Sequence, residues 1–86
     1  MTYNKNMKTM ERINNYLNDN TFKITMYGTN AVNIVNYTEI KDFSLNKIVV
    51  SYEKRKIIIE GLDLTINKML DDEVLIEGVI SSIRIN

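Results

Sequence analysis

The sequence predicts a mainly β fold: a compact antiparallel roll, sandwich or small barrel of about seven short strands, preceded by one short N-terminal amphipathic helix. Apolar residues recur every three or four positions before about Asn20 and every second position from Thr21 onward. β-branched residues dominate the second part, and its connections are too short for the crossovers that parallel strands require. We therefore expect an N-terminal helical segment, residues 1–20, and a single all-β domain, residues 21–86.

The N-terminal segment carries a stripe of apolar residues that predicts the helix. Its members lie three or four positions apart, on the helix face opposite Lys8, Glu11 and Arg12. The stripe consists of Met7, Met10, Ile13, Tyr16 and Leu17. A helix of about eleven residues is marginal by itself in water, so we expect it to dock either on its own sheet or on another protein.

The strands are predicted from the alternation, and the polar residues between them predict tight connections. The expected strands are residues 22–27, 31–35, 39–43, 47–52, 56–61, 62–68 and 74–85. Alternate residues should face the core in pairs: Ile24 with Met26, Val32 with Ile34, Ile48 with Val50, Ile57 with Ile59, Leu64 with Ile66, Val74 with Ile76, and Ile83 with Ile85. Gly28, Gly61 and Gly78 each follow an apolar run, which predicts that the backbone turns a corner there.

The composition excludes most familiar active sites. The 86 residues include no Cys and no His, so thiolate nucleophiles, the commonest general base and the commonest zinc ligand are missing. Eleven Lys plus Arg balance eleven Asp plus Glu, which argues against a nucleic-acid-binding protein. No apolar run reaches the roughly 20 residues of a membrane span, and no secretory signal core is present. We expect a cytoplasmic protein with no catalytic residue, cofactor, metal site or integral membrane segment.

Acidic residues supply the remaining candidates for chemistry. Residues 71–73 are three consecutive carboxylates that would attract a divalent cation, but such a run cannot wrap an ion and is typical of a solvated turn. Glu60 and Glu77 occupy equivalent places beside two glycines. A shared structural role therefore explains them better than an acid-base pair does.

A short basic run lies between two expected strands. Lys54, Arg55 and Lys56 would contact phosphates or an anionic membrane surface, with about 1 kcal/mol for each positive charge. Three charges are also what an ordinary hairpin turn carries. We therefore expect a solvated turn that makes at most a weak anionic contact.

Surplus aliphatic residues predict a surface for interaction. Ile58, Leu75 and Ile80 fall on strand faces that should meet water. In a small domain such a surplus indicates that the helix or another subunit covers the face. The expected interaction residues are Met7, Met10, Ile13, Leu17, Ile58, Leu75 and Ile80.

The strand series also resembles a known family. The first half contains KITMYG at 23–28, VNIVNY at 32–37 and IKDFS at 40–44; the second contains IIIEGLDLTINKML at 57–70 and VLIEGVISSI at 74–83. Over residues 22–85 this order of motifs resembles the YabP/YqfC family of sporulation proteins from endospore-formers. KITMYG and the preceding short helix look closest to the YqfC branch.

The resemblance implies a small all-β protein made in the mother cell, acting in spore development or coat assembly near the forespore. Family members are often encoded beside a membrane-bound sporulation protein, which implies a complex with such a neighbour. The family supplies no catalytic residues. Our first hypothesis is a non-enzymatic scaffold or adaptor that forms homo-oligomers, peripheral at the forespore membrane. The alternative is a module that binds an anionic surface or a small ligand, and a hydrolase or lyase comes third.

Overall fold

Six antiparallel strands form one open sheet in the computed structural model, which describes residues 21–70 and 72–86. Their order across the sheet is β1-β2-β6-β5-β4-β3, so the two longest strands are central. The strands are β1 (Lys23–Tyr27), β2 (Ala31–Val35), β3 (Glu39–Phe43), β4 (Lys47–Tyr52), β5 (Arg55–Met69) and β6 (Glu73–Ile85). The predicted N-terminal helix lies outside the described residues.

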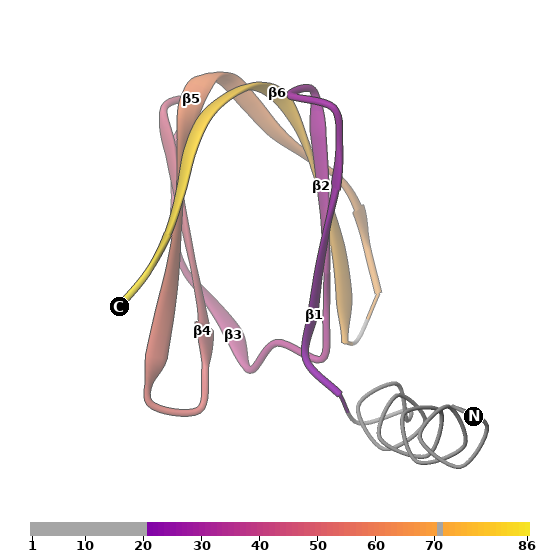
Figure 1. Cartoon of the computed structure of the whole chain (residues 1–86), viewed down its shortest axis with the longest axis vertical. Helices are drawn as coiled ribbons and strands as arrows, with labels where there is room; N and C mark the ends of the chain where they lie inside the picture. The colour runs from indigo at the N-terminus through magenta and orange to yellow at the C-terminus, as the bar shows by residue number, and fades with distance from the viewer. Residues whose placement is uncertain (1–20, 71) are drawn as a thin grey trace, which may run out of the picture.

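The sheet bends into an arch because β5 and β6 each run through both of its sides (Figure 1). The first half of β5 pairs with β4 and with the C-terminal half of β6. The N-terminal half of β6 pairs with β2 and with the second half of β5. The mainly β, antiparallel prediction is therefore confirmed. The small-barrel alternative is wrong, because β1 and β3 form the two ends of an open sheet.

Two of the seven predicted strands are one strand in the structure. Residues 56–61 and 62–68 both belong to β5, which bends without a loop. Asp63, with a φ of 52°, lies at the bend, and the pairing with β6 shifts between Leu62 and Thr65. A second shift, opposite Glu60 and Gly61, leaves one extra residue on β6. Such β-bulges bend a strand while the ladder on either side continues.

Two glycines allow the strands to cross closely at this bend. A Cβ at Gly61 would lie 2.0 Å from the carbonyl oxygen of Val79. Gly78 has a φ of +143°, and a Cβ there would lie 2.8 Å from the carbonyl oxygen of Asp63. Since real Cβ atoms do not approach backbone oxygens so closely, the corner requires glycine at both positions. The predicted role of these two glycines is confirmed.

The turns of the two outer hairpins hydrogen-bond to the same corner. The β3–β4 turn accepts from β5, and the β1–β2 turn accepts from β6. The bonds run from the N–H of Gly61 to Asn46 O (3.0 Å), of Leu64 to Leu45 O (2.8 Å), of Gly78 to Asn30 O (3.0 Å) and of Ile80 to Thr29 O (2.9 Å). These carbonyls accept hydrogen bonds from backbone N–H groups that have no partner strand at the bend.

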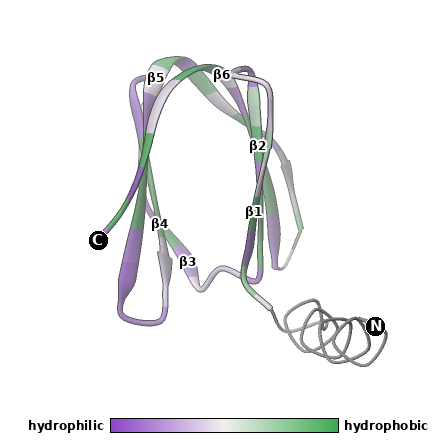
Figure 2. Ribbon diagram, viewed as in Figure 1, coloured by the Kyte–Doolittle hydropathy of each residue, from purple (hydrophilic) through white to green (hydrophobic). Residues whose placement is uncertain are grey.

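The core fills the space between the two sides of the arch. Its fully buried side chains are Val32, Ile34, Ile48, Val50, Ile57, Ile59, Leu64, Val74 and Ile76. Figure 2 shows hydrophobic bands along these strands and a hydrophilic β4–β5 hairpin. At the end away from the bend, the rings of Phe22 and Tyr52 stack with centroids 4.2 Å apart and so join the two sides. The predicted burial of Met26 and Ile85 is wrong: they are 45% and 55% exposed, because both lie on edges of the arch.

The corner yields a stability prediction. We expect Gly61→Ala to lower the free energy of unfolding by about 3 kcal/mol or more, because the new Cβ meets backbone that cannot move aside. Gly28→Ala is the control: its φ is +61°, but a Cβ there has no described atom within 4 Å, so only about 1 kcal/mol of backbone strain is added. Urea unfolding followed by circular dichroism measures both. Equal losses would contradict the role of the crossing.

Candidate functional site

The structure separates the residues predicted for interaction. Met7, Met10, Ile13 and Leu17 lie outside the described residues. Ile58 and Ile80 are only 8% and 7% exposed. Ile80 belongs to the core cluster, so its assignment to the outer face is wrong, whereas Ile58 lies on the outer face as expected. Leu75 is half-buried on the outer face of the sheet.

Ile80 is buried because the side chains of β6 continue to alternate between the two faces of the sheet through the bend. Val74, Ile76 and Ile80 all join the core, and Gly78 continues their side of the strand. The extra residue that reverses the alternation is Ser81, since Glu60 pairs with Ser82 while Gly61 pairs with Ile80. An isolated sequence pattern does not show on which side of the bend the reversal falls.

Ile58 is buried on the outer face by its neighbours in the sheet. It lies opposite Val49 on β4 and Arg84 on β6. The Arg84 guanidinium lies 3.2 Å from the Glu60 carboxylate, two residues along β5 from Ile58. We attribute the burial of Ile58 to the aliphatic stem of Arg84, since this side chain begins opposite Ile58 and ends at Glu60.

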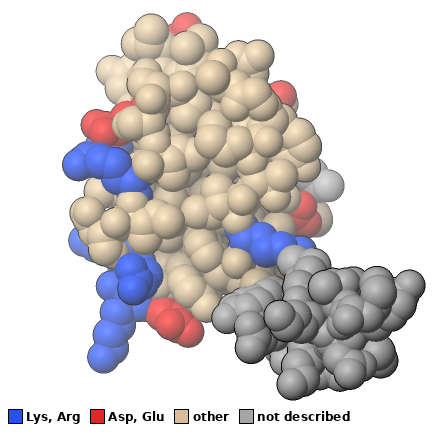
Figure 3. All heavy atoms as spheres, in the orientation of Figure 1, with Lys and Arg blue, Asp and Glu red and all other residues tan. Residues whose placement is uncertain are grey.

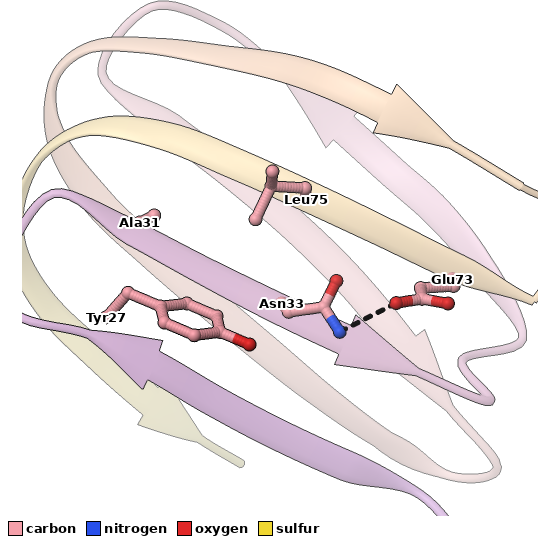
Figure 4. A pocket seen from close by; sticks show the side chains of 5 residues that line it. All are labelled: Tyr27, Ala31, Asn33, Glu73 and Leu75. Atoms are coloured by element: carbon pink, nitrogen blue, oxygen red, sulfur yellow. Dashed lines mark hydrogen bonds between the residues drawn. The ribbon is translucent and has the colours of Figure 1, made fainter.

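Leu75 lines a shallow depression on the outer face of β1, β2 and β6 (Figure 4). Its volume is about 350 Å³, and the other lining residues are Tyr27, Ala31, Asn33 and Glu73. The Asn33 amide donates a 2.9 Å hydrogen bond to the Glu73 carboxylate. An apolar wall beside a polar pair suits the binding of one partner side chain. Reasoning from the sequence missed this depression, because its residues come from three strands.

A second depression opens where the two sides of the arch separate, between β1 and the C-terminal half of β6. Its volume is about 280 Å³, and it is lined by Met26, Thr29, Ile80, Ser81, Ser82 and Ile83. Figure 3 shows that charged side chains lie mainly at the margins of this side of the molecule. We call the surface formed by Met26, Ser81, Ile83 and Ile85 the open face. It combines apolar side chains with two sheet edges.

The predicted basic turn is the tip of the β4–β5 hairpin, at the end of the arch away from the bend (Figure 1). Lys54, Arg55 and Lys56 are all exposed. The ion pairs within the described part of the chain join Lys41 to Glu39 and Arg84 to Glu60, so this turn takes part in neither. Its charges are available to an anionic surface.

Three of the acidic candidates, Glu60, Glu73 and Glu77, have a structural partner, and Asp71 lies outside the described residues. Glu60 accepts one hydrogen bond from the Ser82 hydroxyl and lies beside Arg84, and Glu77 accepts a hydrogen bond from the Asn67 amide. In residues 21–70 and 72–86, no group of three or more His, Cys, Asp or Glu side chains is arranged to hold a metal ion. Within the same residues, no helix has the length and apolar character needed to cross a membrane.

The bent open sheet with its uncharged open face defines the class of the protein: a small all-β domain with exposed strand edges. The model of the YabP family matches residues 18–86, which is most of the chain. The chain therefore belongs to the YabP family, which confirms the resemblance to the YabP/YqfC family without distinguishing the YqfC branch and indicates a sporulation-related protein. No curated protein and no solved structure matches it.

The placement of Ile58 can be tested by stability. We expect Ile58→Asp to lower the free energy of unfolding by about 3 kcal/mol, because a short carboxylate cannot reach water from this position. Val79→Asp is the control at a side chain that is 54% exposed, with an expected cost below about 1 kcal/mol. Urea unfolding at low protein concentration measures both. If Ile58→Asp left the free energy of unfolding unchanged, the side chain at position 58 would have to be in contact with water.

Proposed function

We propose that the chain is a non-enzymatic sporulation protein that works as a self-associating scaffold or adaptor. The open face carries this proposal. It presents apolar side chains between β1 and β6, whose outer edges pair with no further strand among the described residues. Free strand edges and exposed apolar surface are the features through which β domains bind further strands and partners.

Membership of the family supports a setting for this function. The protein would act in the mother cell during spore development or coat assembly, peripheral at the forespore membrane, with a membrane-bound sporulation protein as its partner. An adaptor needs one surface for its own copies and one for the partner. The depression of Tyr27, Asn33 and Leu75 supplies a second surface, on the outer face of β1, β2 and β6.

Self-association is the first test. We expect the purified protein to form oligomers at about 50 µM in sedimentation equilibrium, and Met26→Lys to raise the dissociation constant about 10-fold by placing a charge on the open face. Leu45→Lys is the control, since Leu45 is 60% exposed in the β3–β4 turn. A strict monomer at this concentration would refute the self-associating scaffold.

The alternative function is binding of an anionic membrane surface or a small anionic ligand through Lys54, Arg55 and Lys56. The observation that favours it is their joint exposure at a hairpin tip. Three positive charges near an acidic bilayer contribute about 3 kcal/mol, which corresponds to roughly a 100-fold change in affinity. This is enough for a peripheral contact that assists a second anchor.

Co-sedimentation with vesicles separates the two functions. If the alternative holds, the protein binds phosphatidylserine vesicles but not neutral ones, and the bound fraction falls as salt is raised. Reversing all three charges with Lys54→Glu, Arg55→Glu and Lys56→Glu should then abolish binding. Lys41→Glu provides a control for total charge. Binding that survives the triple reversal would reject the basic turn as the contact.

A further inference from the structure

Bending one sheet into an arch creates more edges than a flat sheet has. One side of the arch ends at β1 and at the second half of β5, and the other ends at β3 and at the C-terminal half of β6. Natural proteins protect exposed edges with bulges, charges, short strands or covering segments, because a free edge is a template for another strand. The protection of each edge therefore indicates which of them is meant to pair.

Three of the edges carry such protection. The register of β3 shifts between Ile40 and Asp42, and its Lys41 forms a 2.7 Å ion pair with Glu39. The second half of β5 has a shift between Ile66 and Lys68. β1 has five residues and begins with a lysine. These features all oppose the addition of a flat neighbouring strand.

On the C-terminal half of β6 the only interruption is the bulge at Ser81, and no described segment covers the edge beyond it. Beyond the bulge at Ser81, its pairing with β5 is regular from Ser82 to Ile85. It contains no Lys and no Pro, and its one charge, Arg84, is engaged by Glu60 on its own sheet. Ile85 is 55% exposed. This edge is therefore regularly paired from Ser82 to Ile85, and two of these four residues are isoleucines.

The backbone groups of this edge point away from the sheet. Asn86 and Lys56 exchange both of their backbone hydrogen bonds, at 2.9 and 3.4 Å. In an antiparallel ladder such pairs alternate with residues whose N–H and C=O groups point to the opposite side. Arg84 is therefore bonded to β5 in the same way as Asn86, whereas Ile83 and Ile85 direct their N–H and C=O groups outward.

We propose that this edge pairs antiparallel with the same edge of a second copy of the chain, with Ile83 opposite its own counterpart. The proposal rests on the self-association proposed above and identifies its surface. A two-fold pairing uses the same patch on both copies and closes the assembly at a dimer. The resulting layer has the order β3-β4-β5-β6 followed by its two-fold copy. The chain's formal net charge of zero adds no net repulsion between copies.

The register follows from the charge on the edge. Centring the pair on Ile83 places Arg84 opposite Ser82 of the second copy. Centring it on Arg84 would place two arginines directly opposite each other, which is destabilising. With Ile83 at the centre, Ile83 and Ile85 of both copies lie on the side of the layer that faces the inside of the arch. The dimer thereby covers apolar surface of the open face as well as the unpaired backbone.

A proline at Ile85 tests the backbone contact. Ile85→Pro removes an outward N–H and no hydrogen bond within the chain, and the fixed φ of proline is tolerated on an edge. Ile85→Ala removes the same side chain but keeps the N–H. We expect Ile85→Pro to raise the dimer dissociation constant about 30-fold relative to Ile85→Ala in sedimentation equilibrium, because two equivalent contacts are lost per dimer. Equal dissociation constants would overturn the backbone pairing.

Cross-linking tests the register, and the chain offers a clean background because it contains no Cys. In the proposed pair, position 82 faces position 84 of the other copy at a Cα separation of about 4.5 Å, which a disulfide spans. We expect a mixture of Ser82→Cys and Arg84→Cys chains to form disulfide-linked dimers under mild oxidation, and each variant alone to form far fewer. Efficient linkage of Arg84→Cys with itself would overturn the register.

The outcomes distinguish this inference from the proposed function. A monomeric wild-type chain would overturn both the self-associating scaffold and the edge pairing. A stable dimer that shows neither the Ile85→Pro effect nor the mixed disulfide would overturn the edge pairing alone. The proposed scaffold function would then remain, with self-association through another surface.

Discussion

The whole structure depends on one backbone contact, the close crossing of β5 and β6 at Gly61 and Gly78. A Cβ at Gly61 would lie 2.0 Å from the Val79 carbonyl oxygen, so the crossing exists only because side chains are missing there. Since both long strands bend at this point, their halves serve both sides of the arch. One sheet can then enclose a core, which a flat sheet of the same strands would leave half exposed. The two outer hairpin turns satisfy the N–H groups that the bend frees.

The same bend determines where the molecule can bind. A flat sheet would expose only the edges of β1 and β3, whereas the arch also exposes the end of β6 and opens the gap beside Met26. Beyond the bulge at Ser81, β6 pairs regularly with β5 from Ser82 to Ile85 along this additional edge. The bulge of β3 has no counterpart between Ser82 and Ile85, so the constraint that builds the core also supplies the edge on which the proposed association rests.

The local alternation of apolar and polar residues predicted much of the sheet. The expected strands 31–35, 39–43 and 47–52 coincide with β2, β3 and β4, and the expected core pairs on β2 and β4 are fully buried. The basic hairpin tip was predicted because its residues are contiguous. The depression beside Asn33 and Glu73 was missed, because these residues are 40 positions apart and meet only through the pairing of β2 with β6. The shielding of Ile58 by Arg84 has the same origin.

By itself, the sequence determined the antiparallel β class, the alternation that selects most core residues, the corner glycines and the family motifs. These depend on the period of side chains along a strand and on the conformational freedom of single residues, which are local properties. The tertiary structure decided that residues 56–68 form one strand, that Ile80 faces the core and that, among the described strands, only β5 pairs with the C-terminal half of β6. The first two follow from the register between β5 and β6, in which the bulges at Asp63 and Ser81 reverse the alternation, and the third follows from the pairing of β2 with β6, which ends at Glu77. Register is a relation between distant segments, so the pattern of either strand alone does not contain it.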